Sequence, residues 1–156
     1  MTETQFRDLC RNASLALQAP SADALGEYGQ IEVDGVDIGL FFDEEETPDM
    51  MFCYVDLGEV ADTNRADIYE NLLTLNLLSG SKTTGVYALD PASGNAIFVV
   101  HFYDPEEMEG NVLAEALRFY ATQANSLRAT LLKKSGSDAR FAVTGSEAGV
   151  SMVDLA

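Results

Sequence analysis

The sequence predicts an α+β fold: a two-layer sandwich with the element order α-βββ-α-ββ-α and an antiparallel sheet. Strand-like alternation of apolar residues occurs in two groups, and a strongly apolar helix separates them. The Asp34-Gly35 pair marks a tight hairpin in the first group, and helical periodicity is present near both ends of the chain. Strands grouped in this way between helices are typical of an α+β domain.

The first helix is expected over residues 3–18. Thr2 and Gln5 have the spacing of a capping box, and Pro20 stops the helix. Leu15 falls on the opposite face from the apolar stripe and has no obvious use inside the domain. The stripe consists of Phe6, Leu9, Cys10, Ala13, Ala16 and Leu17.

Three strands follow this helix. Residues 31–33 and 36–42 flank Asp34-Gly35, a pair that suits a two-residue turn because both turn positions need positive φ. A third strand is expected over residues 50–57, and it is apolar on both faces. Met50, Phe52 and Tyr54 form its second apolar face, and Phe41 likewise lies off the main alternation of its own strand.

The middle helix, residues 68–78, is apolar around most of its circumference. Two neighbouring stripes cover roughly 260°, whereas an arc of ~100° suffices for an ordinary core-facing helix. A domain this small can cover one face of such a helix, so the second face indicates an obligate partner chain. One stripe contains Ile68, Leu72, Leu75 and Leu78, and the other contains Tyr69, Leu73 and Leu77.

Two more strands are expected over residues 84–89 and 96–103. Asp104-Pro105 then supplies an N-cap and a first-turn proline for the closing helix, in which Gly110 breaks or restarts the turn. The helical seam continues to Lys133-Lys134. We therefore predict one domain over residues 1–134 and a mobile tail over residues 135–156, in which residues 141–144 are a candidate short added strand.

Composition excludes several classes of function. Nine basic residues against 26 acidic ones give a formal net charge of −17, which argues against binding to nucleic acid or to an anionic membrane. No apolar run approaches the ~18 residues of a membrane span, and the first residues lack signal-peptide features. We expect a cytoplasmic protein in which Cys10 and Cys53 are reduced and buried.

No catalytic constellation is recognisable. His101, the single histidine, lies in an apolar strand and is expected to be a strand or interface residue that senses pH rather than a catalytic base. The acidic runs at 44–46 and 106–109 lack the alternating ligands and the glycine of a calcium loop. No phosphate-binding glycine motif is present either. We expect no enzyme activity, no cofactor and no metal, and a binding role instead.

Three segments together resemble a known family. They are Leu72–Leu78, the strand and turn from Gly85 to Gly94, and the closing helix with Leu113, Leu117-Arg118-Phe119, Ala124 and Leu127. Their order and spacing resemble the class I type III secretion chaperones of the Tir-chaperone (CesT-like) family, over about residues 3–133. Leu127 replaces an aromatic residue common in the family, and the tail after Ser135 is long.

The resemblance implies a non-enzymatic homodimer that binds the N-terminal segment of a secreted effector in extended form. It implies the secretion ATPase as a further partner. By the same resemblance, the dimer interface falls on Leu72, Leu73, Asn76, Leu77, Val86, Tyr87 and Leu89. The candidate effector-binding residues are Leu15, Phe41, Met50, Phe52 and Tyr54. Two alternatives remain open at this stage: a small domain that binds an apolar ligand, and a dimeric adaptor unrelated to secretion.

Overall fold

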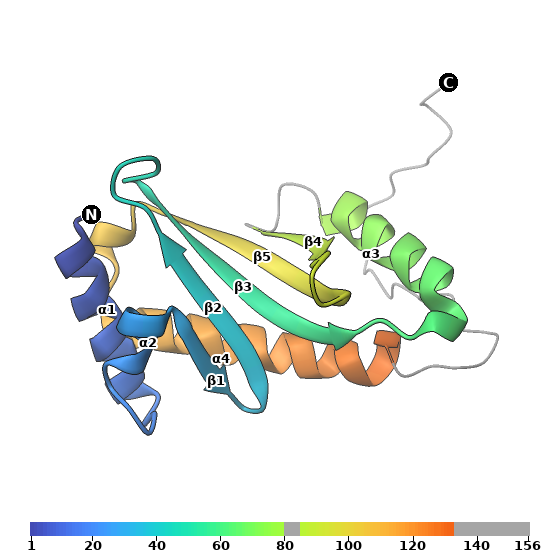
Figure 1. Cartoon of the computed structure of the whole chain (residues 1–156), viewed down its shortest axis with the longest axis horizontal. Helices are drawn as coiled ribbons and strands as arrows, with labels where there is room; N and C mark the ends of the chain where they lie inside the picture. Colours follow the sequence, from blue (N-terminus) through green and yellow to red (C-terminus); the bar gives the residue numbers. More distant parts are fainter. Residues whose placement is uncertain (80–84, 133–156) are drawn as a thin grey trace, which may run out of the picture.

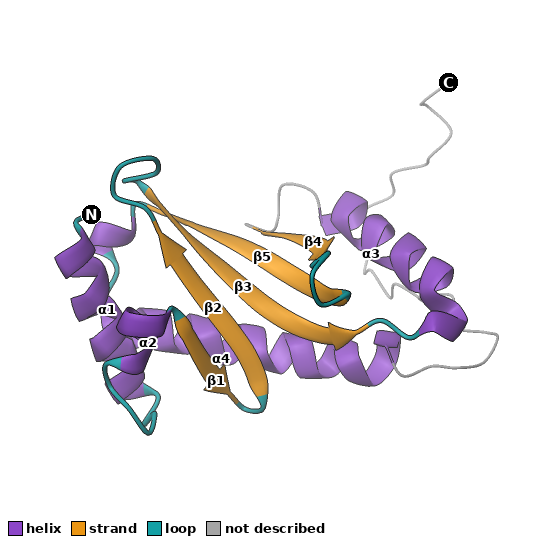
Figure 2. Ribbon diagram, in the orientation of Figure 1, coloured by secondary structure: helices purple, strands orange, loops and turns teal. Residues whose placement is uncertain are grey.

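The computed structural model describes residues 1–79 and 85–132, and contains a five-stranded sheet covered on one face by helices (Figures 1 and 2). The strand order is β1-β2-β3-β5-β4, with every neighbouring pair antiparallel. The predicted fold class is therefore confirmed. The elements are α1 (Glu3–Ala16), α2 (Ala24–Tyr28), β1 (Gln30–Val33), β2 (Val36–Phe42), β3 (Met50–Glu59), η1 (Asp62–Asn64), α3 (Arg65–Ser79), β4 (Gly85–Leu89), β5 (Asn95–Tyr103), η3 (Pro105–Glu107), α4 (Gly110–Leu127) and η4 (Arg128–Leu132).

Helix α4 runs behind the sheet as seen in Figure 1, with α1 and α2 at one end of the molecule and α3 beside β4 at the other. The capping box of α1 forms as expected: the Gln5 amide donates to Thr2 Oγ1 at 3.2 Å, and the Thr2 amide donates to Gln5 Oε1 at 2.7 Å. This arrangement leaves one face of the sheet outside the helical layer. We call it the outer sheet face.

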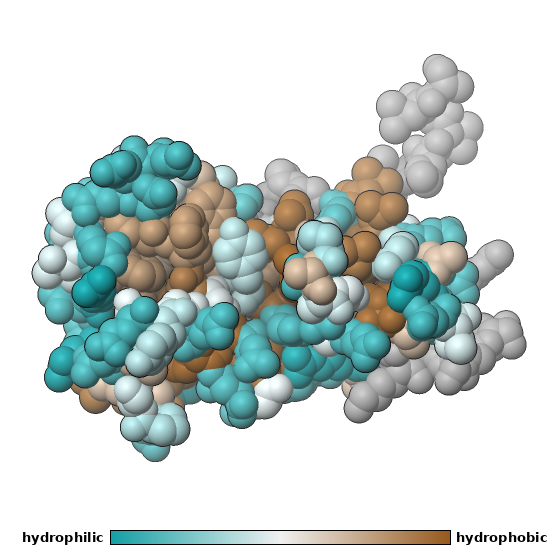
Figure 3. Space-filling model, in the orientation of Figure 1, coloured by the Kyte–Doolittle hydropathy of each residue, from teal (hydrophilic) through white to brown (hydrophobic). Residues whose placement is uncertain are grey.

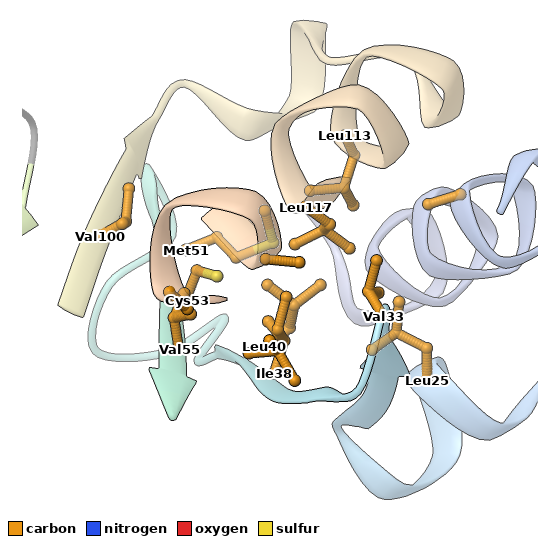
Figure 4. Packing of buried hydrophobic residues seen from close by; sticks show 14 of the residues in the cluster. Leu25, Val33, Ile38, Leu40, Met51, Cys53, Val55, Val100, Leu113 and Leu117 are labelled. Carbon is orange, nitrogen blue, oxygen red and sulfur yellow. The ribbon is translucent and has the colours of Figure 1, made fainter. Parts of the chain in front are cut away.

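The core lies between the inner sheet face and helices α1 and α4 (Figure 4). Alternate residues of β2 and β3 point inward, which places Ile38, Met51 and Val55 in one buried cluster with Leu113 and Leu117 of α4. The close approach of α1 to α4 depends on Gly110, because a Cβ there would lie 2.4 Å from the Cβ of Asn12. This packing holds the sheet and the helices in fixed relative positions, so the outer sheet face has a defined surface.

The structure differs from the expected elements in three places. Helix α1 ends at Ala16 rather than at residue 18. Helix α2 was not expected, because five residues are too few to show a periodic pattern. The closing helix restarts at Gly110, one of the two outcomes expected for that glycine, whereas the N-cap expected at Asp104 was wrong: Asp104 has φ 48° and makes no side-chain cap, and Pro105–Glu107 forms only the turn η3. The predicted tail, residues 135–156, lies outside the described residues.

Candidate interaction surfaces

A row of aromatic rings crosses the outer sheet face from β2 through β3 to β5. Strand pairing aligns Phe41 with Phe52 and Phe52 with His101. The ring centroids are 6.3 Å apart for Phe41 and Phe52, and 5.2 Å apart for Phe52 and His101, which meet edge to face. Tyr54 lies 6.5 Å from Phe52, and Tyr103 lies 6.4 Å from His101. We call these five residues the aromatic row.

The aromatic row is partly open to solvent. Phe41 is 51% exposed, Tyr54 39% and Tyr103 62%, while Phe52 and His101 are half-buried. Figure 3 looks onto this side of the molecule and shows brown to pale-brown surface in its left half, with teal surface above and below it. Exposed aromatic rings that stand together rather than singly are typical of an interaction site.

Four of the five candidate effector-binding residues share this face. Phe41, Phe52 and Tyr54 belong to the aromatic row, and half-buried Met50 pairs with Tyr103 at its end. Leu15 is separate: it is 59% exposed, as its position off the apolar stripe predicted, but it lies on α1, which packs against α4. The structure therefore assembles one continuous surface and one isolated leucine.

A second apolar surface lies at the opposite end of the molecule, on α3. Ile68 and Leu72 are buried in the core, whereas Leu73 and Leu77 are 69% and 70% exposed. Leu78 is also 55% exposed, because only the N-terminal half of its stripe reaches the core. We call Leu73, Leu77 and Leu78 the α3 leucine face. Its exposure matches the surplus apolar surface that the two stripes predicted.

Asn76 does not face solvent from this helix. Its Nδ2 donates to the Tyr87 carbonyl at 2.9 Å, and its Oδ1 accepts from the Tyr87 amide at 2.7 Å. One side-chain amide thus takes both hydrogen bonds that a further strand would make to Tyr87 on the edge strand β4. We call this pair the Asn76–Tyr87 clamp, and it fixes α3 to the sheet.

The expected dimer residues on β4 point to different sides. Val86 pairs with Val99 on the outer sheet face and is 48% exposed. Tyr87 packs on Phe98 at 4.7 Å on the inner side, where burial raises the pKa of its hydroxyl. Leu89 is 39% exposed. It lies two residues after Tyr87 on β4, so its side chain is on the same side of the sheet as Tyr87 and on the opposite side from Val86. Leu72 and Tyr87 are thus used largely inside the chain, whereas Val86 and Leu89 flank the sheet edge.

The titratable side chains form no reactive centre in the part of the chain that is described. Burial raises the pKa of both the Cys10 and the Cys53 thiol to about 12, so neither is an available nucleophile. No group of three or more His, Cys, Asp or Glu residues among the described positions is placed to hold a metal ion. No helix within residues 1–79 and 85–132 is long and apolar enough to cross a membrane.

Tyr103, His101 and Leu78 belong to these surfaces but were absent from the expected sites. The alternation of the last strand, in which His101 and Tyr103 share one face, is the pattern that would have found the first two. Leu78 belongs to the stripe that also contains buried Leu72, so its exposure depends on where α3 leaves the core. Sequence periodicity does not contain that information.

The comparisons agree with this arrangement of elements. The Tir chaperone protein (CesT) family matches residues 22–128, and the chain belongs to this family of type III secretion chaperones. No curated protein matches the sequence. The fold is similar to the crystal structure of the ExsC–ExsE complex, with a TM-score of 0.67 at 12% identity, over 85% of this chain and 98% of that one.

Two further solved structures have the same fold. The HopA1–SchA chaperone–effector complex aligns with a TM-score of 0.55 at 14% identity, over 81% of this chain and 95% of that one. The ExoU–SpcU complex from the type III secretion system of Pseudomonas aeruginosa aligns with a TM-score of 0.50 at 19% identity, over 85% and 98%. At these identities the likeness concerns the fold.

Proposed function

We propose that this protein is a cytosolic, non-enzymatic chaperone that binds the N-terminal segment of a type III secreted effector in extended form and keeps it competent for secretion. Family membership supports the chaperone class. The observation that carries the binding mode is the aromatic row, an open apolar surface on a sheet whose other face is already filled by the core. The secretion ATPase remains a proposed later partner of the loaded complex.

The aromatic row is suited to an unfolded segment because it offers area rather than a closed pocket. Fully burying a large apolar side chain contributes roughly 1.5–3 kcal/mol before ordering costs, so completing the burial of the half-exposed Phe41 ring adds ~1 kcal/mol. Met50 adds a flexible side chain that adapts to different cargo residues. Several such contacts, none of them decisive alone, give binding without a unique cargo sequence.

We further propose that two copies associate through the α3 leucine face, with Val86 and Leu89 beside it. The second half of α3, residues 71–79, contains no charged residue, so two copies of this acidic chain meet there without bringing like charges together. Leu73 and Leu77 are 69% and 70% exposed and stand on one stripe. The Asn76–Tyr87 clamp holds the helix in place for such a contact.

The dimer is tested by sedimentation at micromolar concentration. Wild-type protein is expected to be a dimer, and Leu77→Asp a monomer or an aggregate, because the contact would desolvate an unpaired carboxylate. Leu15→Asp is the matched control: Leu15 is similarly exposed at the other end of the molecule, so this variant stays dimeric. A monomeric wild type, or two variants that behave alike, would contradict the interface.

Cargo binding is tested in two steps. The chaperone is first purified from its native bacterium and the bound protein is identified; it must be a substrate of the secretion system. The N-terminal segment of that protein then serves as the probe. Phe41→Asp is expected to weaken capture at least about fivefold, the equivalent of ~1 kcal/mol, without unfolding the chaperone, since surface substitutions usually change stability by less than about 1 kcal/mol.

Phe119→Asp supplies the control for this second step. Phe119 is 58% exposed on α4, close to the value for Phe41, but it lies outside the aromatic row. Weaker capture by Phe41→Asp than by Phe119→Asp supports the outer sheet face as the binding site. Equal capture by both variants refutes it, and loss of structure in Phe41→Asp would show that Phe41 is a core residue. The same comparison with Leu15→Asp decides whether Leu15 contributes.

A further inference from the structure

The five strands in the described part of the chain contain no lysine and no arginine. All five described arginines lie on helical elements: Arg7 and Arg11 on α1, Arg65 on α3, Arg118 on α4 and Arg128 on η4. Each is already engaged there by a carboxylate or by backbone carbonyls. Within the described residues, the outer sheet face therefore has acidic groups and no cation of its own strands to balance them.

Acidic residues lie beyond both ends of the aromatic row. Glu32 and Asp37 are direct cross-strand partners, and both are exposed. Asp37 alternates with Gly39 and Phe41, which places it on the outer sheet face. Like charges directly opposite each other are destabilising in a sheet, so this pair stores repulsion that a bound cation would relieve. At the other end, exposed Asp49 and Asp104 adjoin the paired residues Met50 and Tyr103.

Gly39 leaves a low point between these two features. It stands between Asp37 and Phe41 along β2 and pairs with Tyr54. A Cβ at Gly39 would meet the Tyr54 Cβ at 3.8 Å and the Gly29 carbonyl oxygen at 3.6 Å, both ordinary contacts. The fold therefore accepts a side chain at this position, although the sequence has none. A ligand side chain resting on Gly39 would lie beside the Tyr54 ring and close to the Asp37 carboxylate.

We propose that the outer sheet face selects cargo segments in which large apolar side chains are accompanied by arginine or lysine, and that the cation sits near Gly39. This inference rests on the proposed cargo-binding function. The Tyr54 and Phe41 rings attract a cation within ~6 Å of their faces, and the Glu32–Asp37 pair adds direct charge attraction. A second copy of the chain is a poor occupant of this face, because its strands present the same acidic and cation-free surface.

The test uses three short synthetic peptides with one shared apolar framework and arginine, glutamine or glutamate at the same positions. Binding is measured by fluorescence anisotropy at low and at moderate salt. Wild-type protein is expected to bind the arginine peptide about tenfold more tightly than the glutamine peptide, and the glutamate peptide least, with the preference shrinking as salt rises. Equal binding of the arginine and glutamine peptides would overturn the proposal.

Substitutions at Gly39 then locate the effect. Gly39→Lys, Gly39→Gln and Gly39→Glu add side chains of similar length, so their steric cost is shared and only the charge differs. The Gly39→Glu variant should bind the arginine peptide most tightly, Gly39→Gln less tightly and Gly39→Lys least, with at least about a tenfold difference in affinity between the first and the last. The effect is expected because the charge at residue 39 and the bound arginine lie within one Debye length of each other. Glu115→Gln, an exposed change on α4, shifts the net charge as much as Gly39→Lys does relative to wild type, and should have little effect.

A second measurement separates binding from folding. Changing Glu32→Gln together with Asp37→Asn should stabilise the protein slightly, because it removes the like-charge pair, and should weaken binding of the arginine peptide about fivefold. Misfolding cannot produce these opposite signs. If Glu115→Gln weakens binding as much as the Gly39→Lys change does, the attraction belongs to the net charge and the proposal fails.

The two proposals fail in different ways. Suppose the native effector segment is captured in a manner that depends on Phe41 but is unaffected by the charge at Gly39. The cargo-binding function then stands and only the cation preference is wrong. If Phe41→Asp leaves capture of that segment intact, the outer sheet face is not the cargo site and both proposals fall.

Discussion

The Asn76–Tyr87 clamp gives a quantitative prediction about how α3 is held. Asn76→Ala removes two hydrogen bonds of 2.7 and 2.9 Å and leaves the half-buried Tyr87 amide and carbonyl without this partner. Each such bond contributes a net ~0.5–1.5 kcal/mol, giving a loss of about 2 kcal/mol. Alanine is the better helix former and returns at most about 0.7 kcal/mol. The expected net loss is therefore about 1–2 kcal/mol.

The measurement is urea unfolding at one fixed protein concentration, because self-association would add to apparent stability. Thr74→Ala, an exposed change on the same helix, is the control for propensity and is expected to be neutral or slightly stabilising. Hydrogen exchange at the Tyr87 amide provides a local readout and should accelerate only in Asn76→Ala. If the two variants are equally stable and the amide exchanges as in wild type, the clamp does not hold α3.

Asn76→Asp separates the two bonds of the clamp. A carboxylate still accepts from the Tyr87 amide but cannot donate to the Tyr87 carbonyl, which repels it. Protonation restores a donor, so the folded state raises the pKa of the new carboxyl above its unfolded value. The deficit relative to wild type is therefore full at neutral pH, shrinks as pH falls through the raised pKa of the folded state, and is smallest below the unfolded pKa of about 4. A deficit that does not change with pH would mean that the donated bond contributes nothing.

Three further predictions concern packing, thiols and charge. Gly110→Ala should destabilise the protein by about 2 kcal/mol in thermal unfolding, because the new Cβ would lie 2.4 Å from the Asn12 Cβ and 2.9 Å from the Ala13 amide nitrogen. A more stable variant would mean that α1 does not pack there. Cys10 and Cys53 should resist alkylation at neutral pH until urea is added, and stability should fall above pH ~9, by about 1 kcal/mol per thiol at pH ~10, because only the unfolded thiols ionise there. The protein should not retard DNA or RNA in a gel even at low salt, and salt-sensitive retardation would contradict the argument from net charge.

Local patterns were sufficient where a residue's role depends on its own element. The capping box at Thr2, the Asp34-Gly35 hairpin and the alternation of β2 and β3 follow from spacing alone, and each is present in the structure. The exposure of Leu15 and Phe41 followed in the same way, since both lie off the apolar pattern of their own element. The two stripes of α3 also predicted a helix with more apolar surface than the core covers.

Long-range contacts account for what the sequence did not show. The role of Asn76 depends on β4 lying beside α3, a placement that no local pattern encodes. Arg128 is similar: its guanidinium donates to the carbonyls of Asp56, Leu57 and Gly35 at 2.8, 3.1 and 3.0 Å, and so ties the end of the closing helix to strand β3 and to the β1–β2 turn. The start of that helix at Gly110 also reflects packing on α1 rather than the Asp104-Pro105 signature.

Charge placement accounts for how one acidic chain would both form the proposed dimer and hold the proposed cargo. Residues 71–79 of α3 are uncharged, so a symmetric contact there brings no like charges into direct apposition. The outer sheet face has the opposite character, because its rings are bordered by Glu32, Asp37, Asp49 and Asp104, and apposing two such faces would bring eight carboxylates together. Under the two proposals above, charge directs self-association to one end of the molecule and leaves the sheet to a partner that supplies the missing positive charge.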